Sequence, residues 1–434
     1  MPYDLDARED GFEERFRDFL NVRRDSGADV DGRVAEILKD VYHRGDSAVL
    51  EYTELLDRHR LTPKGMRVTG EELRGAVERC DPDTVAALQT ARERIEAFHA
   101  LQKPEDLDYR DAQGVRMGHR WTPIKAAGLY VPGGTAAYPS SVLMNAVPAK
   151  VAGVERVVMV VPAPDGKLNP LVLAAADVAG IDEVYRIGGA QAVGALAYGT
   201  ETIAPVDKIV GPGNAYVASA KRQVFGTVGI DMIAGPSEVL VVADGRNDPA
   251  IIAADLLAQS EHDANAQAIL ITDDGDFAVA VQRAVDSHLQ RLPRSEIAGR
   301  SWAQYGAVIR VASLDDAPAL VDRVAPEHLE LAVAEPDALM ARISHAGAIF
   351  LGRTTPEVIG DYVGGPNHVL PTGRSARFSS GLSVLDFMKR STFLDCPPEG
   401  LRAIGPAAVT LAEAEGLDAH ALSVALRLSG GGGE

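Results

Sequence analysis

The sequence predicts an α/β protein with two parallel-sheet domains, a helical N-terminal arm and a small C-terminal extension. Short apolar runs alternate with alanine-rich helical patterns through the middle of the chain, and glycine-rich turns follow several of these runs. Strands that alternate with helices form parallel sheets that are covered by helices on both faces. Hydrophobic residues make up 46% of the 434 residues, which suffices for such cores and excludes a disordered protein.

The first hundred residues have the pattern of helices. Residues 1–25 are highly charged with scattered apolar positions, which predicts a short helical arm. Within residues 30–100, apolar side chains recur every three or four positions, the period of an amphipathic helix. They are Val34, Ile37, Leu38 and Val41, and later Val85, Leu88, Ala91, Ile95 and Phe98.

Two α/β blocks follow, roughly over residues 130–236 and 237–382. The first block predicts strands at 154–161, 184–187 and 209–210, and helices at 171–179 and 190–198. The second block predicts strands at 239–242, 268–272, 308–311 and 348–351, and helices at 249–259, 277–289 and 317–324. Beyond residue 383 the pattern is mixed, and the four glycines before Glu434 predict a disordered tail.

The charge balance argues against two classes of partner, nucleic acid and anionic membranes. The chain carries 43 basic and 62 acidic residues, a net charge of −19, and its longest basic clusters are pairs such as Lys221-Arg222 and Lys389-Arg390. Such a surface repels nucleic acid and anionic membranes. No apolar stretch is long enough to span a bilayer, and the N-terminus lacks the apolar segment of a secretory signal, so we expect a cytoplasmic protein.

Three glycine-rich turns follow predicted strands, at 131–134, 188–191 and 211–214. Glycine lets a backbone approach a phosphate closely, and the helix that follows attracts the negative charge. None of the turns completes the dinucleotide fingerprint, because Tyr216 stands where a third small residue is needed. The domains are therefore Rossmann-like but incomplete, and the residues alone are compatible with tight turns or with nucleotide contacts.

Three short segments pair an oxygen donor with an imidazole. They are Gln259 with His262, and Asp255 on the same predicted helical face; Asp361 with His368 across a turn; and Glu415 with His420. Oxygen and imidazole ligands suit zinc or the harder manganese ion, and the two distant cysteines argue against a structural zinc site. Each histidine is also compatible with a helix-surface or hydrogen-bonded core position.

The dipeptide Glu327-His328 follows Pro326, which ends the preceding helix. A carboxylate beside an imidazole is a frequent proton-transfer pair near neutral pH. At a turn both side chains can face one cleft. The alternative is an ordinary surface turn.

Seven segments, taken together and in order, resemble the histidinol dehydrogenase family over nearly the whole chain. They are residues 131–145, 211–214, 231–238, 257–262, 325–330, 364–372 and 380–387. The resemblance implies NAD-dependent, four-electron oxidation of L-histidinol to L-histidine through L-histidinaldehyde, the last two steps of histidine biosynthesis. It also implies two successive proton transfers, in which His328 accepts the alcohol proton and Glu327 activates water for attack on the aldehyde.

The resemblance further implies a set of site residues. Those similar to zinc ligands are Gln259, His262, Asp361 and His420, with one ion per subunit and Mn²⁺ as the alternative. Those similar to further substrate contacts are Ser237, His368 and Glu415, together with the four ligands and His328. Those similar to cofactor contacts are Tyr130, Gln191 and Asn214.

The implied assembly is a homodimer with shared active sites, in which residues 383–434 are exchanged and bring Glu415 and His420 to the partner. The expected domains are the arm at 1–25, a metal-binding and catalytic domain from 26–129 with 237–382, and an NAD-binding domain at 130–236. Two other functions use the same residues. One is a metal-dependent hydrolase that needs no nucleotide, and the other is a non-catalytic protein that binds amino-acid-like ligands.

Overall fold

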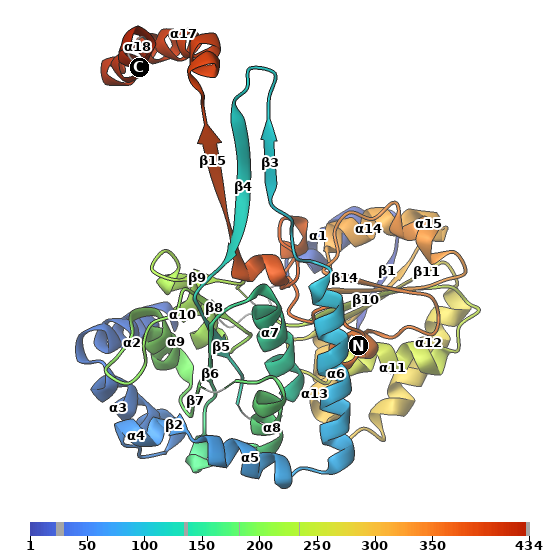
Figure 1. Cartoon of the computed structure of the whole chain (residues 1–434). Helices are drawn as coiled ribbons and strands as arrows, with labels where there is room; N and C mark the ends of the chain where they lie inside the picture. Colours follow the sequence, from blue (N-terminus) through green and yellow to red (C-terminus); the bar gives the residue numbers. More distant parts are fainter. Residues whose placement is uncertain (23–29, 134–137, 182, 234, 431–434) are drawn as a thin grey trace. The chain divides into compact units, whose positions relative to one another are not determined.

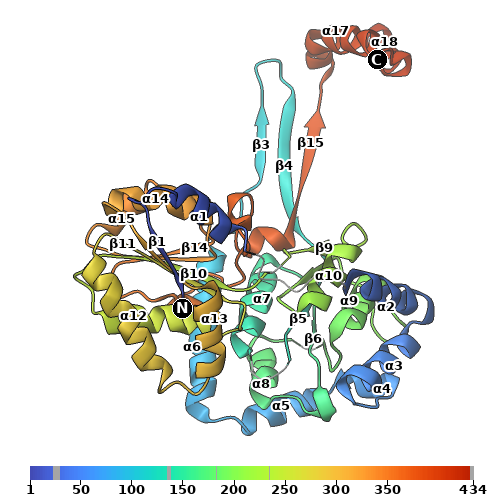
Figure 2. The same cartoon turned by 180° about the vertical axis from the view of Figure 1, so that it is seen from behind.

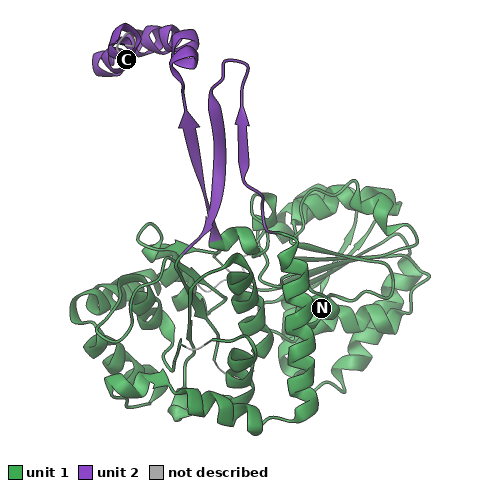
Figure 3. Cartoon of the chain, in the orientation of Figure 1, with its two compact units in different colours: residues 1–102, 125–387 green, residues 103–124, 388–434 purple. Residues whose placement is uncertain are grey.

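The computed structural model describes residues 1–22, 30–133, 138–181, 183–233 and 235–430. The chain divides into two compact units (Figure 3): unit 1 comprises residues 1–102 and 125–387, and unit 2 comprises residues 103–124 and 388–434. Unit 1 holds two six-stranded sheets, here named sheet A and sheet B. The predicted α/β class with two parallel sheets is confirmed.

Sheet A is parallel throughout its six strands (Figure 1). Their order is β1 (Tyr3–Asp6), β12 (Ala307–Arg310), β11 (Gln267–Thr272), β10 (Glu238–Ala243), β13 (His328–Ala332) and β14 (Ala348–Leu351). Side chains alternate across a strand, so each strand feeds two cores. In β10, Val239 and Val241 belong to one buried cluster, whereas Leu240 and Val242 belong to the other.

Helices cover both faces of sheet A. The cluster that contains Val239 also contains side chains of α11 (Pro249–Ser260), α12 (Gly275–Leu289) and α13 (Ser295–Tyr305). The cluster that contains Leu240 contains side chains of α1 (Phe12–Leu20), α14 (Ala317–Val324) and α15 (Pro336–Met340). One short helix, α16 (Glu357–Tyr362), follows β14 and contacts β13.

Sheet B is parallel except at one edge, where its first strand pairs antiparallel. The order is β2 (Arg67–Val68), β7 (Glu183–Tyr185), β6 (Arg156–Val160), β5 (Ala126–Tyr130), β8 (Lys208–Val210) and β9 (Gly229–Ile230). In Figures 1 and 2, α7 (Pro139–Ala152) and α8 (Pro170–Val178) lie on one face, and α9 (Gly189–Tyr198) and α10 (Ala215–Val224) lie on the other.

The early helices pack around sheet B. They are α2 (Val30–Arg44), α3 (Asp46–Asp57), α4 (Pro63–Met66), α5 (Gly70–Glu78) and α6 (Pro82–Ala100). Helix α2 contacts α9 and α10, α5 contacts α8, and α6 contacts α7 and α8. The segment 26–129 is thus divided: α2 to α5 and β5 accompany sheet B, whereas residues 103–124 belong to unit 2.

The expected helical arm at 1–25 is only partly correct. Residues Phe12–Leu20 form α1, but Tyr3–Asp6 form β1, which pairs with β12 at the edge of sheet A. Leu5 is buried there, so the short segment gains an apolar anchor and a partner for its backbone groups. Residues 23–25 lie outside the described residues.

Unit 2 is a three-stranded antiparallel sheet with two helices. Its strands are β3 (Leu107–Arg110), β4 (Arg116–Pro123) and β15 (Met388–Asp395), in the order β15-β4-β3. Its helices are α17 (Pro398–Ala414) and α18 (Asp418–Gly430), which contact each other. The predicted disordered tail at 431–434 lies outside the described residues. Among the residues that the structure describes, no helix has the length and apolar character needed to cross a bilayer.

Candidate active site

The centre of the site is the start of β13. Helix α14 ends at Val324, Ala325 takes a left-handed conformation (φ 48°), and the chain then enters the strand at His328. One residue of the neighbouring strand β10, Glu238, contacts both residues of the predicted pair through its backbone. Glu327 Oε2 accepts a hydrogen bond of 2.9 Å from the Glu238 amide, and His328 Nδ1 lies 3.0 Å from the Glu238 carbonyl oxygen.

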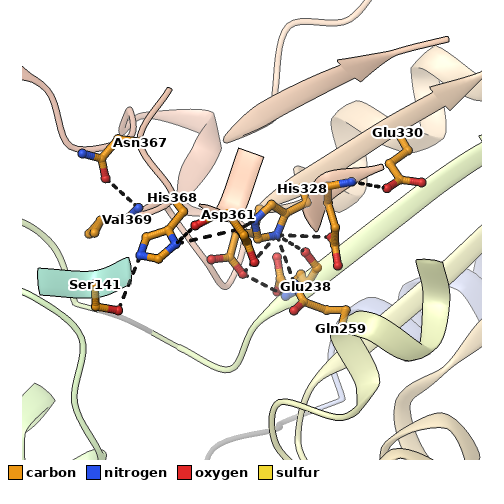
Figure 4. A network of polar contacts seen from close by, with 11 residues as sticks. Ser141, Glu238, Gln259, His328, Glu330, Asp361, Asn367, His368 and Val369 are labelled. Carbon is orange, nitrogen blue, oxygen red and sulfur yellow. Dashed lines mark hydrogen bonds and ion pairs between the residues drawn. The ribbon is translucent and has the colours of Figure 1, made fainter. Parts of the chain in front are cut away.

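The ring of His328 is 4% exposed and has polar neighbours on both nitrogens (Figure 4). Gln259 Nε2 lies 3.0 Å from Nδ1, and Asp361 Oδ1 lies 3.4 Å from Nε2 as an ion-pair contact, not an aligned hydrogen bond. The Gln259 amide nitrogen only donates and the Glu238 carbonyl only accepts, so the two compete for Nδ1. A neutral His328 therefore finds a partner for Nδ1 in either tautomer, and Nε2 is free to accept or to donate a proton.

Carboxyl groups surround this imidazole. Glu327 Oε2 and Glu357 Oε2 each lie 3.7 Å from His328 Nδ1. Burial would lower the pKa of His328, but Glu327, Glu357 and Asp361 together raise it well above its usual value. Burial raises the pKa of Glu327 to about 8 and that of Glu357 well above its ordinary value. The pKa of Asp361, which burial alone would raise, is lowered by its contact with His328.

A second histidine links this cluster to α7. His368 Nδ1 lies 3.0 Å from the Asp361 carbonyl oxygen, and its Nε2 lies 3.5 Å from Ser141 Oγ (Figure 4). Asn367 beside it donates to the Met144 carbonyl at 2.6 Å. The turn between Asp361 and His368 therefore brings these two residues together, and burial lowers the pKa of His368, which favours the neutral ring.

His262 lies beyond the helix on which it was expected. Helix α11 ends at Ser260, so Gln259 is in its last turn and His262 is in the turn that follows. The His262 side chain is open to solvent, but surrounding protein atoms disfavour its charged form and lower its pKa. Asp361 is near enough to act on that pKa in the opposite sense.

The residues of unit 1 fit part of a divalent metal site. Gln259 Oε1 accepts no hydrogen bond from the described residues, and the buried His328 Nε2 has no hydrogen-bond partner. No lysine or arginine of the described part pairs with Glu327, Glu357 or Asp361. A buried cluster with this excess of carboxyl groups favours a cation, because unpaired buried negative charge is costly.

No group of three His, Cys, Asp or Glu side chains in the described ranges is arranged to hold a metal ion. The predicted ligand set explains this result. In unit 1 it contains only two residues of those types, His262 and Asp361, because Gln259 is an amide. The fourth ligand, His420, lies in unit 2.

Glu415 and His420 share one surface of unit 2. Both are exposed, and both line a cavity of about 690 Å³ on α17 and α18, together with Leu411, Leu417 and Val424. Their role at the site therefore stays a prediction. Ser237 precedes Glu238 directly and is half-buried, and its carbonyl oxygen accepts from the Gln267 amide.

The predicted cofactor contacts lie where strands of sheet B end. The Tyr130 hydroxyl accepts a hydrogen bond of 3.0 Å from the Gly189 amide, and the Asn214 side chain caps α10. Gln191 is buried in the first turn of α9, and no hydrogen-bond partner of its Oε1 is found in the described part of the chain. Gly211 adopts φ 111°, and a Cβ there would meet the Tyr130 carbonyl oxygen at 2.1 Å. Close-packed glycine turns with an unpaired buried amide oxygen fit a nucleotide site.

Four polar residues near this site were not among the predicted ones: Ser141, Glu238, Glu330 and Glu357. Spacing in the sequence could have identified two of them. Glu330 follows His328 at the period of a strand face, and Glu357 precedes Asp361 by one helical turn. Glu238 acts through its backbone, and Ser141 approaches from α7, so no local spacing identifies them.

Comparison with known proteins gives one consistent family. A model of the family "Histidinol dehydrogenase" matches residues 21–428. A protein of Rhodospirillum rubrum named histidinol dehydrogenase is 64% identical over 99% of this chain and 100% of its own length, and one of Agrobacterium fabrum is 64% identical over 96% and 97%. The crystal structure of histidinol dehydrogenase from Elizabethkingia anophelis superposes with a TM-score of 0.94 at 37% identity, over 99% of this chain and 98% of the other.

Proposed function

The chain belongs to the histidinol dehydrogenase family, an oxidoreductase family, and from this premise we propose that it oxidises L-histidinol to L-histidine through L-histidinaldehyde. The observation that carries the proposal is the gathering of Gln259, Asp361 and Glu327 around the imidazole of His328. These residues come from α11, β13 and α16 and from the turn before β13, so the fold itself brings them together.

The first oxidation requires that a hydroxyl proton and a hydride leave the carbinol. We assign the proton to His328 Nε2, which has no hydrogen-bond partner among the described residues and holds a lone pair in the neutral ring while Nδ1–H donates to the Glu238 carbonyl. The surrounding carboxyl groups raise the pKa of His328, which makes this neutral ring a stronger base. Two molecules of NAD, bound in turn, would each accept one of the two hydrides. Gln191, Asn214 and the glycine turns of sheet B are the proposed contacts for NAD.

The second oxidation requires that water add to the aldehyde carbon. We assign the removal of a proton from this water to Glu327, whose carboxyl is held by the Glu238 amide at 2.9 Å. Burial raises the pKa of Glu327 to about 8, so its carboxylate is a stronger base than an exposed one. The hydrated aldehyde then loses its second hydride, and the product is the carboxylate.

The proposed zinc ligands in unit 1 are Gln259, His262 and Asp361. Zn²⁺ supplies a Lewis acid that orients the imidazole and amine nitrogens of histidinol. Mn²⁺ is the alternative ion, since the set offers only oxygen and imidazole donors. His368 and Ser237 are proposed to contact the substrate, because one joins Asp361 and the other adjoins Glu238.

We further propose that two copies of the chain share their sites, with Glu415 and His420 of unit 2 completing the set on a partner subunit. Two features support this assignment. The ligand set within unit 1 is incomplete, and α17 and α18 expose Leu411, Leu422 and Leu426. Exposed leucines on packed helices are typical of surfaces that become buried in an assembly.

The decisive experiment measures NAD reduction by the purified protein with L-histidinol, before and after treatment with a chelator. We expect two NADH per histidinol, loss of the signal with chelator, and its return when zinc is added. No NADH in any of these mixtures would refute the proposal. Conversion of substrate without NAD would instead favour a metal-dependent hydrolase.

A further inference from the structure

Two buried carboxyl groups and one half-buried carboxyl group lie close to the proposed site. Glu330 is 3% exposed, and its Oε1 accepts a hydrogen bond of 2.6 Å from the Glu357 amide (Figure 4). The Glu330 carboxyl also hydrogen-bonds to the carboxyl of Asp255. Glu357 is 2% exposed, and its Oε2 has no hydrogen-bond partner within the described ranges. We call Asp255, Glu330 and Glu357 the carboxyl layer.

Each member of the carboxyl layer shares one face of its strand or helix with a residue of the site. The pairs are Glu330 with His328 on one face of β13, Asp255 with Gln259 on α11, and Glu357 with Asp361 on α16. Residues at i and i+2 of a strand, or at i and i+4 of a helix, share a face. The same three elements therefore meet twice, once at the site and once at the carboxyl layer.

The carboxyl layer must hold a proton. Two carboxylates cannot hydrogen-bond to each other unless one of them carries a hydrogen. No lysine or arginine of the described residues pairs with any of the three groups. Burial raises the pKa of Glu330 to about 8 and that of Asp255 to about 6, which agrees with a proton kept at neutral pH. The other ionisable groups that face the layer are His328, Asp361 and Glu327.

We propose that the carboxyl layer is a proton-sharing device that positions the metal site, by fixing α11 and α16 against β13. Its members are positioning residues, since they act through Gln259, His328 and Asp361. The shared proton replaces the repulsion of adjacent carboxylates with a directional bond. The inference rests on the proposed zinc site and adds residues that the family resemblance does not assign.

The test uses three substitutions of Glu330 and two metal probes. In Glu330→Gln the side chain keeps its length, donates to Asp255 and still accepts from the Glu357 amide, without a charge. Glu330→Asp keeps the charge but is one methylene too short. Glu330→Leu removes both bonds. Zinc affinity is measured by competition with a chelator, and the visible spectrum of the Co²⁺-loaded full-length protein reports the ligand geometry.

We expect Glu330→Gln to bind zinc within about threefold of the unchanged protein and to give the same cobalt spectrum. We expect Glu330→Asp and Glu330→Leu to bind zinc about 10–100-fold more weakly and to shift the spectrum, the range typical for lost outer partners of a metal site. Glu335→Gln, an exposed substitution, is the matched control. If Glu330→Leu does not fold, the zinc affinities and cobalt spectra of the Gln and Asp variants are compared and decide between the two outcomes.

Three results would overturn the inference. Unchanged zinc affinity in Glu330→Leu would show that the carboxyl layer positions nothing. If zinc affinity were kept in Glu330→Asp but lost in Glu330→Gln, the position would require a charge and not a shared proton. If the unchanged protein bound neither zinc nor cobalt, the proposed metal site would fall, and this inference with it.

Discussion

Replacement of Glu327 by Gln separates the two oxidations. The carboxyl is 6% exposed and accepts from the Glu238 amide at 2.9 Å. A Gln side chain retains that bond through its Oε1 and has nearly the same volume, so we expect the fold to be kept. What Gln loses is the ability to take a proton from water.

The expected size of the rate loss follows from the role of Glu327 as a general base. A positioned general base contributes about 10²–10⁴ in rate, which corresponds to about 3–5 kcal/mol of transition-state stabilisation. We expect this loss in the oxidation of L-histidinaldehyde, with a much smaller loss in the first oxidation, where His328 takes the proton. In a single turnover with L-histidinol, the variant should release one NADH rapidly and the second slowly.

The assay follows NADH absorbance by stopped flow, with L-histidinol and L-histidinaldehyde as separate substrates. Glu335→Gln, an exposed carboxyl substitution, serves as the control for handling and charge. Equal losses in the two oxidations would refute the assignment of Glu327 to the hydration step. A variant with unaltered aldehyde oxidation would exclude Glu327 as a base altogether.

Further predictions concern the metal, the assembly and the cofactor turn. His262→Asn should lower bound zinc, measured by elemental analysis; a full complement would exclude His262 as a ligand. Glu327→Gln and His420→Asn chains, each impaired in steady-state formation of histidine, are unfolded and refolded together. They should regain about one quarter of the full steady-state rate, since half of the random dimers are mixed and each has one intact site; no recovery would argue against shared sites. Lys221→Met should lower the free energy of unfolding by about 3–5 kcal/mol in urea titration, because Lys221 is 2% exposed and pairs with buried Asp231; a loss below about 1 kcal/mol would contradict the importance of that pair.

The central strands and helices were predictable because they have strong periodic signals. The strand expected at 239–242 is β10 (Glu238–Ala243), and the helix expected at 249–259 is α11 (Pro249–Ser260). In contrast, β4 (Arg116–Pro123) and β15 (Met388–Asp395) were missed. Their side chains are mostly half-buried or exposed, so they lack the alternation that a core imposes on a strand.

The site itself was only partly predictable, for a physical reason seen in β13. In His328-Leu329-Glu330-Leu331, polar and apolar residues alternate, as in a strand with one solvated face. Here the polar face is buried against α11 and α16, so the polar residues mark the site and not the surface. The sequence identified Glu327 and His328 as a pair, but the roles of Glu238 and Ser141 depend on packing between segments far apart in the chain.

The helices of the two sheets present opposite ends to the ions and small molecules that are proposed to bind there. In a parallel α/β sheet the helices run antiparallel to the strands, so helix C-termini lie at the amino ends of the strands. The proposed metal site is at that edge of sheet A: Gln259 is in the last turn of α11, and Glu327 follows the end of α14. Negative helix ends favour a cation, here a divalent ion and a protonated amino alcohol.

Sheet B presents the other polarity. Tyr130 and Gly211 lie at the carboxyl ends of β5 and β8, and α9 and α10 begin at this edge. Positive helix ends favour the phosphates of a dinucleotide. The carboxyl edge of sheet A has a cavity of about 840 Å³, but Asp244, Asp273 and Asp274 line it, a poor surface for a phosphate. The choice of edge in each sheet thus follows from the sign of the ligand's charge, which explains why the proposed catalytic residues lie at the amino ends of the strands in an α/β fold, where ligands ordinarily bind at the carboxyl ends.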